Sequence, residues 1–269
     1  MNAANNQPGN FSGVKQIFLY NWHFYAAAVV LDLLVWFWLR HSLPASASIL
    51  VCFAAALASF WAVSSLLASH YVYDRSDLYQ WNWLKSALKR NPQLWINIHA
   101  GLDQSSESLV RLFPNSRHRI LDIYTQSEMT EPSIRRARNY TPSAVAAERA
   151  NPLTLPLEDC ACDTIFLIFV AHELRSPTTK IQFFHELHRA LAPGGCIVLA
   201  EHLRDWKNFL AYGPGAFHFF SRRTWLAVAA EAGLSITKEF GIASFVRCFV
   251  FTKTVADSVS RQSGDTSCA

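Results

Sequence analysis

The sequence predicts an α/β protein: a doubly wound, mostly parallel sheet of seven strands, preceded by a two-helix hairpin that spans a membrane. Between residues 93 and 255, short apolar runs alternate with segments of helical periodicity, a pattern typical of parallel strands joined by covering helices. Before residue 70, two apolar runs are each long enough to cross a bilayer. Apolar residues make up 51% of the 269-residue chain, which is high for a soluble protein. The excess lies mostly in that first part.

The expected hairpin, residues 17–69, consists of two apolar segments at residues 17–39 and 47–68. At about 1.5 Å per residue, each segment spans the roughly 30 Å hydrocarbon layer. A short connection puts both outer ends on one side of the membrane. Lysine and arginine are more numerous on that side than in the turn, which holds Arg40. The positive-inside rule therefore places the following domain in the cytoplasm, attached by two spans to a membrane of the bacterial inner type.

Asp32 lies inside the first apolar segment, where a carboxylate costs about 2.5 to 3.5 kcal/mol on insertion scales. Such a residue indicates either a function within the membrane or a structural role. In the structural case, Asp32 is protonated or is hydrogen-bonded to a serine of the second segment, such as Ser59 or Ser64.

Three further segments flank these regions. Residues 1–16 are expected to form an N-terminal tail, residues 70–92 a linker along the membrane surface, and residues 256–269 a disordered tail rich in Ser, Asp and Thr. The linker is crowded with aromatic rings of the kind that lie at the headgroup boundary. These rings are Tyr71, Tyr73, Tyr79, Trp81 and Trp83.

The charge pattern bears on the partners. The net charge is +4, and no basic stripe interleaved with exposed aromatic residues is visible, so nucleic acid is not an expected partner. The lipid bilayer is the expected partner, and the sequence carries no signal for an oligomeric state.

The soluble domain, residues 93–255, is expected to hold the sheet. Its strands are predicted at residues 95–99, 119–123, 144–147, 163–170, 196–201, 234–240 and 245–252, and its helices at residues 105–113, 133–139, 178–191 and 223–232. The strand at residues 163–170 is almost wholly apolar, as a central strand buried on both faces should be. Ligands of such sheets bind outside the carboxyl ends of the strands, so residues that follow strands are the candidates for function.

Asp122 lies at the end of the second predicted strand. A carboxylate there can accept hydrogen bonds from both hydroxyls of a ribose, because it offers two acceptor oxygens. The alternative is a carboxylate that caps a helix or simply faces solvent.

Three segments of the domain resemble, in order, the landmarks of class I S-adenosylmethionine-dependent methyltransferases, especially the small-molecule branch. The first is ILDIYTQSEM at residues 120–129, followed by the arginines of residues 135–138. The second is LPLED at residues 155–159, followed by Asp163, and the third is LAPGG at residues 191–195. The resemblance covers residues 94–253. It implies a Rossmann-like methyltransferase fold, methyltransferase activity and S-adenosyl-L-methionine as the cofactor.

The resemblance also implies positions that bind the cofactor. It places Asp122 on the ribose, Ile123 or Tyr124 on the adenine ring, and Asn151 on the adenine edge, where relatives usually carry Asp. The rest of the predicted cofactor-binding set is Asn97, His99, Ala100, Gly101, Asp103, Pro152 and Phe169.

The glycine loop departs from the family pattern. Relatives have an acid at the position of Asn97 and glycines at the positions of His99, Gly101 and Asp103, and only Gly101 matches. Three alternatives follow. The loop binds S-adenosylmethionine with altered contacts, Asp103 pairing with its ammonium group; it holds a different ligand or supports an unusual adenosyl chemistry; or the domain is inactive and serves as a membrane adapter.

Methyl transfer depends mainly on positioning, and a base assists when the acceptor is a hydroxyl. His172 and His202 each follow a predicted strand, and His218 lies in an aromatic segment, so these three are the candidate catalytic residues. An unperturbed imidazole, with a pKa of about 6.5, suits proton removal near neutrality. A purely structural hydrogen bond is the alternative for each. No metal site is predicted, because His185 and His188 lack the i, i+4 spacing of zinc proteases.

The aromatic segment, residues 206–220, favours a lipophilic small molecule as the methyl acceptor, entering from the bilayer. A quinone precursor, a polyketide or an isoprenoid would fit, with methylation of oxygen favoured. Core packing or membrane contact by the same segment is the competing interpretation.

Overall fold

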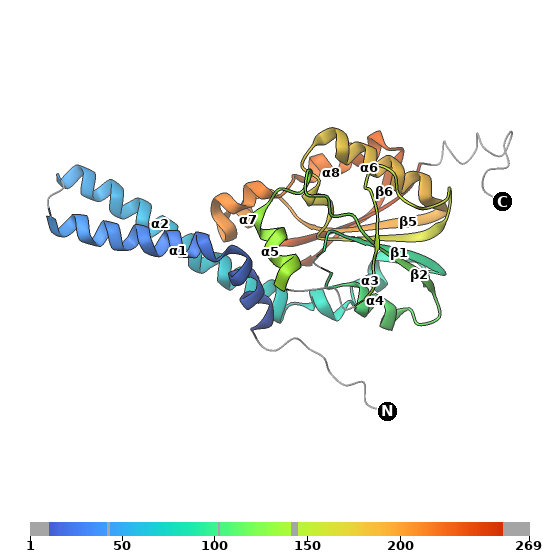
Figure 1. Ribbon diagram of the computed structural model, residues 1–269, viewed down its shortest axis with the longest axis horizontal. Coiled ribbons are helices and arrows are strands. Elements are labelled where there is room, and N and C mark those ends of the chain that lie inside the picture. Colours follow the sequence, from blue (N-terminus) through green and yellow to red (C-terminus); the bar gives the residue numbers. More distant parts are fainter. Residues whose placement is uncertain (1–10, 42–43, 102, 141–144, 255–269) are drawn as a thin grey trace, which may run out of the picture.

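A seven-stranded sheet forms the centre of the computed structural model, which describes residues 11–41, 44–101, 103–140 and 145–254 (Figure 1). The strand order is β3-β2-β1-β4-β5-β7-β6. The strands are β1 (Leu94–His99), β2 (Arg117–Asp122), β3 (Glu148–Arg149), β4 (Cys162–Ile168), β5 (Leu191–His202), β6 (Leu234–Ala243) and β7 (Val246–Lys253). β7 pairs antiparallel with both of its neighbours, and the other pairs are parallel. The predicted mostly parallel, seven-stranded sheet is therefore confirmed.

The helices cover both faces of the sheet and extend away from it at one end (Figure 1). The α-helices are α1 (Ser12–His41), α2 (Ala45–His70), α3 (Leu84–Ala87), α4 (Ser106–Leu112), α5 (Pro132–Tyr140), α6 (Pro177–Ala190), α7 (Trp206–Tyr212) and α8 (Arg222–Glu231). A π-helical segment, η1 (Tyr71–Arg75), continues α2, and three 3₁₀ segments are η2 (Asp77–Gln80), η3 (Ala171–Glu173) and η4 (Gly213–His218).

Two apolar cores form, one on each face of the sheet. The strand residues Ile96, Ile165 and Ile197 belong to the first core, together with side chains from α5, α6 and α8. Trp95 and Phe166 belong to the second, together with side chains from α3 and α4. Neighbouring residues of one strand enter different cores because side chains alternate along a strand. This is why the central strands are almost continuously apolar, as a sheet covered on both faces requires.

The starts of the helices after β4 and β5 are set by local capping. The Ser176 hydroxyl accepts a hydrogen bond from the Thr179 amide at 3.4 Å, and Pro177 occupies the first turn of α6. The Asp205 carboxylate accepts from the Asn208 amide at 2.9 Å at the start of α7. These caps fix where the connections leave the carboxyl ends of the strands.

Two expectations about local structure are corrected. The third strand is β3, Glu148–Arg149, rather than residues 144–147, because pairing with the end of β2 decides its place: Leu121 lies opposite Glu148 and Asp122 opposite Arg149. Trp81 and Trp83 are only 5% and 7% exposed and pack in the second core, so these rings line the sheet and do not face a headgroup layer.

The hairpin of α1 and α2 projects from the domain as a pair of adjacent helices (Figure 1). Both helices are long and apolar enough to cross a membrane by length and composition, and only 6% of each apolar window is buried. Large apolar side chains such as Phe24, Val29 and Phe53 are more than half exposed. The hairpin is therefore not a core element of the domain.

Hydrogen bonds join the two helices of the hairpin to each other and join the start of α1 to η1. The Ser59 hydroxyl donates to the Asp32 carboxylate at 2.5 Å, which confirms the hydrogen-bonding alternative for Asp32. The Asp74 carboxylate of η1 accepts from the amides of Gly13 and Val14 at 2.7 and 3.0 Å, so it caps the start of α1. The predicted tail at residues 256–269 and residues 1–10 of the predicted N-terminal tail lie outside the described residues. Residues 12–16, predicted as part of the N-terminal tail, instead form the start of α1.

Candidate active site

The hairpin packs at the carboxyl end of the sheet, where ligands of parallel sheets bind. α1 contacts α5, which follows β2, and α2 contacts α7, which follows β5. A cavity of about 60 Å³ lies between the start of α1 and this edge. Its lining includes Gly13, Gln16 and Ile17 of α1, with Ser105 and Phe169 from the segments after β1 and β4. Small-molecule sites usually measure about 300 to 1,000 Å³, so this space is closed in the arrangement described.

Asp122 ends β2, as predicted, and its carboxylate is held by Arg138 of α5. Arg138 Nη1 and Nη2 each donate to a different oxygen of Asp122 at 3.0 Å. Arg138 also donates to the Ala100 carbonyl at 3.1 Å, and its guanidinium lies 4.3 Å from the centre of the Tyr124 ring. One side chain thus contacts three predicted cofactor-binding residues. The sequence did not single out Arg138, because α5 carries Arg135, Arg136 and Arg138 and resembles a solvated face.

Gly101 supplies the positive φ that the loop after β1 requires, with a value of 105°. A Cβ atom at Gly101 would collide with the side chain of Arg138. Arg138 therefore lies against both the glycine loop and Asp122 in the arrangement described.

Several side chains of the loop hydrogen-bond within it, while Asn97 Oδ1 and His99 Nε2 are buried without a hydrogen-bond partner among the described residues. The buried His99 accepts the Gly101 amide through Nδ1 at 3.0 Å. Asn97 donates to the hydroxyls of Ser105 and Ser106 at 2.9 and 2.7 Å. Asp103 accepts the Ser106 amide at 2.9 Å, and its side chain is 1% exposed. The side chain of Asp103 is thus buried within the loop, and its pairing with a cofactor ammonium group stays a prediction.

Of the remaining predicted cofactor-binding residues, Ile123 and Pro152 are buried, whereas Tyr124, Asn151 and Phe169 are at least partly exposed. Ile123 is fully buried in the first core, so it cannot stack on an adenine, whereas Tyr124 is partly exposed. Asn151 is exposed and accepts the Leu153 amide at 2.9 Å, while Pro152 is buried. Phe169 has a positive φ of 53°, which is unusual for a residue with a Cβ, and its ring stacks on His202.

His202 is buried and both of its ring nitrogens are engaged. Nδ1 lies 2.9 Å from the Phe245 carbonyl, which can only accept, so Nδ1 carries the proton and Nε2 accepts from the Tyr73 hydroxyl at 2.9 Å. Burial lowers the pKa of His202 to about 4, and the carbonyl of Phe245 offsets part of this effect. The structural alternative is therefore the correct one for His202, and it has no free nitrogen for a substrate.

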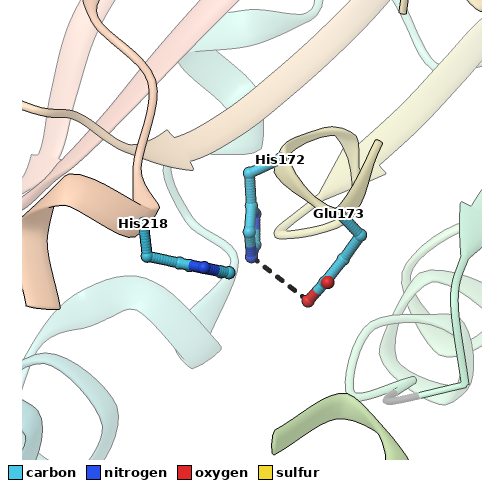
Figure 2. A group of neighbouring side chains, drawn as sticks. All are labelled: His172, Glu173 and His218. Atoms are coloured by element: carbon cyan, nitrogen blue, oxygen red, sulfur yellow. Dashed lines mark ion pairs between the residues drawn. The ribbon is translucent and has the colours of Figure 1, made fainter. Parts of the chain in front are cut away.

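His172 and His218 come together with Glu173 in one cluster (Figure 2). His172 and Glu173 lie on η3 after β4, and His218 lies on η4, which follows α7. His172 Nε2 is 3.4 Å from a Glu173 oxygen, and His172 Nδ1 is 2.7 Å from Glu201, a fully buried carboxylate of β5. The imidazoles of His172 and His218 meet edge to face with centroids 5.1 Å apart.

The charges of the cluster shift both imidazoles away from the expected pKa of about 6.5. Burial lowers the pKa of His172, but Glu201 and Glu173 outweigh it and raise the pKa to about 10. Burial and the nearby His172 lower the pKa of His218 to about 3. Glu173 and Glu201 were not predicted as site residues. Their signal in the sequence was their position at or just after the carboxyl ends of β4 and β5.

Comparisons with known proteins agree with this architecture. Residues 101–199 match the family model described as a methyltransferase domain. The comparison with curated proteins gave no match.

Similar solved structures include an S-adenosylmethionine-dependent methyltransferase from Aquifex aeolicus, with 15% identity, 62% of this chain and 86% of that chain covered, and a TM-score of 0.49. Another, from Methanosarcina mazei, has 15% identity, covers 64% and 97% of the two chains, and has a TM-score of 0.45. An O-methyltransferase from neocarzinostatin biosynthesis, solved with S-adenosyl-L-homocysteine and 1,4-dihydroxy-2-naphthoic acid, has 16% identity, covers 71% and 58%, and has a TM-score of 0.45.

Because these TM-scores are below 0.5, the assignment of a methyltransferase domain rests on the match of residues 101–199 to the family model. That match covers the segment from the glycine loop through β5, which contains Gly101, Asp122 and the cluster residues His172 and Glu173. It supports an enzyme with a methyltransferase domain.

Proposed function

We propose that the chain is a membrane-anchored, S-adenosylmethionine-dependent methyltransferase that acts on a lipophilic small molecule, with methylation of oxygen favoured. One observation carries this proposal: the apolar hairpin leaves the domain at the carboxyl edge of the sheet, where α1 closes the cavity beside Phe169 and Ser105. A hairpin embedded in lipid would place that edge against the membrane, so an apolar acceptor could reach it without crossing water.

The exposed apolar surface continues from the hairpin onto α7 and η4. Trp206, Leu210 and Phe217 are 71%, 54% and 59% exposed. Phe209 of α7 packs edge to face against Trp61 of α2 with ring centroids 5.6 Å apart. Exposed patches of this kind mark contact with a membrane or an apolar ligand. They extend the proposed membrane surface up to the segment that carries His218.

In this proposal, different residues bind the cofactor and position the acceptor. Asp122 binds the ribose hydroxyls after Arg138 has moved, and Tyr124 and Asn151 line the adenine end. The bound cofactor supplies a methyl group on a sulfonium, which is already activated for displacement. Positioning of the acceptor then provides most of the acceleration. The acceptor hydroxyl binds beside the cluster of His172, Glu173 and His218, which includes a buried Glu173 oxygen with no hydrogen-bond partner among the described residues.

The test is methyl transfer from a methyl-labelled cofactor to an extract of membrane lipids. We expect label in an organic-soluble product formed by the detergent-solubilised chain. Asp122→Ala should abolish the labelled product, and Glu158→Ala, which changes an exposed acid away from the site, should retain it. Label that appears only in water-soluble material would contradict the lipophilic acceptor.

A second candidate function is a catalytically inactive membrane adapter. The observation that favours it is the pair of hydrogen bonds that Arg138 makes to Asp122, together with the closed 60 Å³ cavity. An adapter would bind no S-adenosylmethionine, so calorimetry of the purified chain separates the two functions directly.

A further inference from the structure

The cluster of His172, Glu173 and His218 has the composition of a metal site. One ligand atom from each of the three residues lies within 4.8 Å of the other two. Figure 2 shows the three side chains converging, with the imidazole of His172 between His218 and the Glu173 carboxylate. Two imidazoles and one carboxylate form a common protein ligand set for divalent first-row transition metals.

Glu173 adds an independent observation that points to a ligand. The residue is 9% exposed, and its Oε2 atom is buried without a hydrogen-bond partner among the described residues. Leaving a buried charged oxygen unpaired is costly, so such an atom usually marks a missing partner. A cation between Glu173 and the two imidazoles would provide one.

A neighbouring carboxylate orients His172 in the way that metal-binding histidines are usually oriented. Glu201, whose side chain is fully buried, lies 2.7 Å from His172 Nδ1, which leaves Nε2 directed at the proposed ion. Metal-bound histidines almost always donate their other ring nitrogen to a carboxylate, a carbonyl or a water. The Arg175 guanidinium donates to the carbonyls of His172 and His218 at 3.2 and 2.6 Å, so it joins the two segments that carry the imidazoles.

We propose that His172, Glu173 and His218 bind a divalent transition-metal ion at the carboxyl edge of the sheet, with Glu201 as the residue that orients His172. Two ligands bound at about 2.1 Å from one ion lie at most about 4.2 Å apart, so the widest separation in the cluster closes on binding. The side chain of His218 is 26% exposed, which gives it room to move and opens a path for the ion. Glu131, 3.6 Å from His218 Nδ1, stands at that opening.

Three protein ligands leave coordination positions open, as in catalytic metal sites. An acceptor hydroxyl bound there would be polarised by the ion, which acts as a Lewis acid and favours loss of the hydroxyl proton. This role rests on the proposed methyltransferase function. The ion site itself does not, because it follows from the side-chain geometry alone.

The experiment titrates zinc chloride into the full chain, solubilised in detergent, freed of affinity tags and treated with a chelator. No cofactor and no acceptor are present, so the result is independent of methyl transfer. We expect one equivalent of Zn²⁺ bound with micromolar or lower Kd by calorimetry. Cobalt chloride should give visible absorption bands of a protein-bound ion in the same stoichiometry.

Variants locate the site. His218→Gln and Glu173→Gln should each weaken zinc binding at least about 100-fold, and Glu201→Gln about 10- to 100-fold through loss of orientation. His185→Gln, which changes an exposed imidazole of α6, should bind as the unchanged chain does. Thermal unfolding of each variant checks that it is folded, and His218→Gln, at the most exposed of the three positions, serves if the others unfold.

Absence of stoichiometric zinc binding by the unchanged chain would overturn the proposal. So would unchanged affinity in folded His218→Gln and Glu173→Gln. A chain that binds zinc but fails to bind S-adenosylmethionine would retain the metal site and contradict the methyltransferase function, so the two failures are distinguishable.

Discussion

Arg138 holds the residue on which an adenosyl cofactor would depend. Its bidentate contact with Asp122 at 3.0 Å competes with the ribose hydroxyls for the same two oxygens. Both side chains are largely buried, with 21% and 13% exposure, so the contact is better defined than a surface ion pair. In the proposed function, cofactor binding displaces Arg138 from Asp122.

Arg138→Gln should raise the affinity for S-adenosylmethionine, because the cofactor no longer has to break the contact with Asp122. The expected decrease in Kd is about three- to tenfold, measured by calorimetry. Arg135→Gln, on the exposed side of the same helix, is the matched control and should leave Kd unchanged. A weaker affinity in Arg138→Gln would show that the arginine helps to bind the cofactor instead of blocking it.

His202 should make stability depend on pH below neutrality. Its pKa is lowered to about 4 in the folded chain, while an unfolded histidine has a pKa of about 6.5. Between these values the unfolded chain binds the extra proton, so stability falls as pH falls from about 6.5 to 4, by about 3 kcal/mol in total. Unfolding midpoints at pH 7.5 and 5.5 should differ less in His202→Gln than in the unchanged chain. His185→Gln should keep the full difference.

Several residue-level features could be predicted from sequence because they depend on local position. Asp122 follows directly from its place at the end of a strand, and Ser59 was one of two serines named as a partner for Asp32. The partner of Asp122 could not be predicted, since Arg138 is one of three arginines on a short helix. The three histidines also look alike in sequence, and only their buried neighbours give His202 a lowered pKa and His172 a raised one.

At the scale of elements, α1 has two functions in the structure: it forms half of the hairpin and closes the cavity at the carboxyl edge of the sheet. Its first turn is fastened by Asp74, which lies about one turn beyond the end of α2. Asp74 accepts hydrogen bonds from two first-turn amides, which have no partner within the helix itself.

Asp74→Ala should loosen the first turn of α1. Loss of a helix-capping carboxylate costs about 0.5 to 2 kcal/mol, so the amides of Gly13 and Val14 should exchange with deuterium several times faster. Hydrogen-deuterium exchange with mass spectrometry of the solubilised chain measures this. Asp77→Ala, at an exposed position in η2, is the control. Equal exchange in all three chains would show that Asp74 does not fasten α1.

Strands and helices with clear apolar patterns were predicted within a few residues, whereas the short elements were not. β3 has two residues, and both are charged or polar, so no pattern identifies it. By composition alone, the aromatic side chains of residues 71–83 fit a membrane surface as well as they fit a buried core. The burial of Trp81 and Trp83 in the core of Trp95 and Phe166 depends on tertiary packing.

In the proposed function, the whole molecule holds its methyltransferase domain against a membrane with the carboxyl edge of the sheet toward the lipid. The hairpin, α7 and η4 supply the apolar surface, and the sheet supplies the site. The sequence indicated both parts, but not that they meet at one edge, because the contacts of α1 with α5 and of α2 with α7 join residues far apart in the chain.

The chain should remain with membranes after washing at alkaline pH. Val29→Arg combined with Phe60→Arg, which charges the exposed face of both helices near mid-span, should release a large part of it, since each arginine costs about 2.5 to 3.5 kcal/mol at the bilayer centre. Gln182→Arg, an exposed change on α6, should not. Recovery of the unchanged chain in the soluble fraction would contradict the membrane anchor.

Calorimetric titration of the detergent-solubilised chain with S-adenosylmethionine is the decisive test of the proposed cofactor site. We expect saturable binding of one cofactor at micromolar concentration, weakened at least about tenfold by Asp122→Ala because the ribose loses its acceptor. Absence of binding in both the unchanged chain and Arg138→Gln would contradict the proposed cofactor site and leave the adapter function.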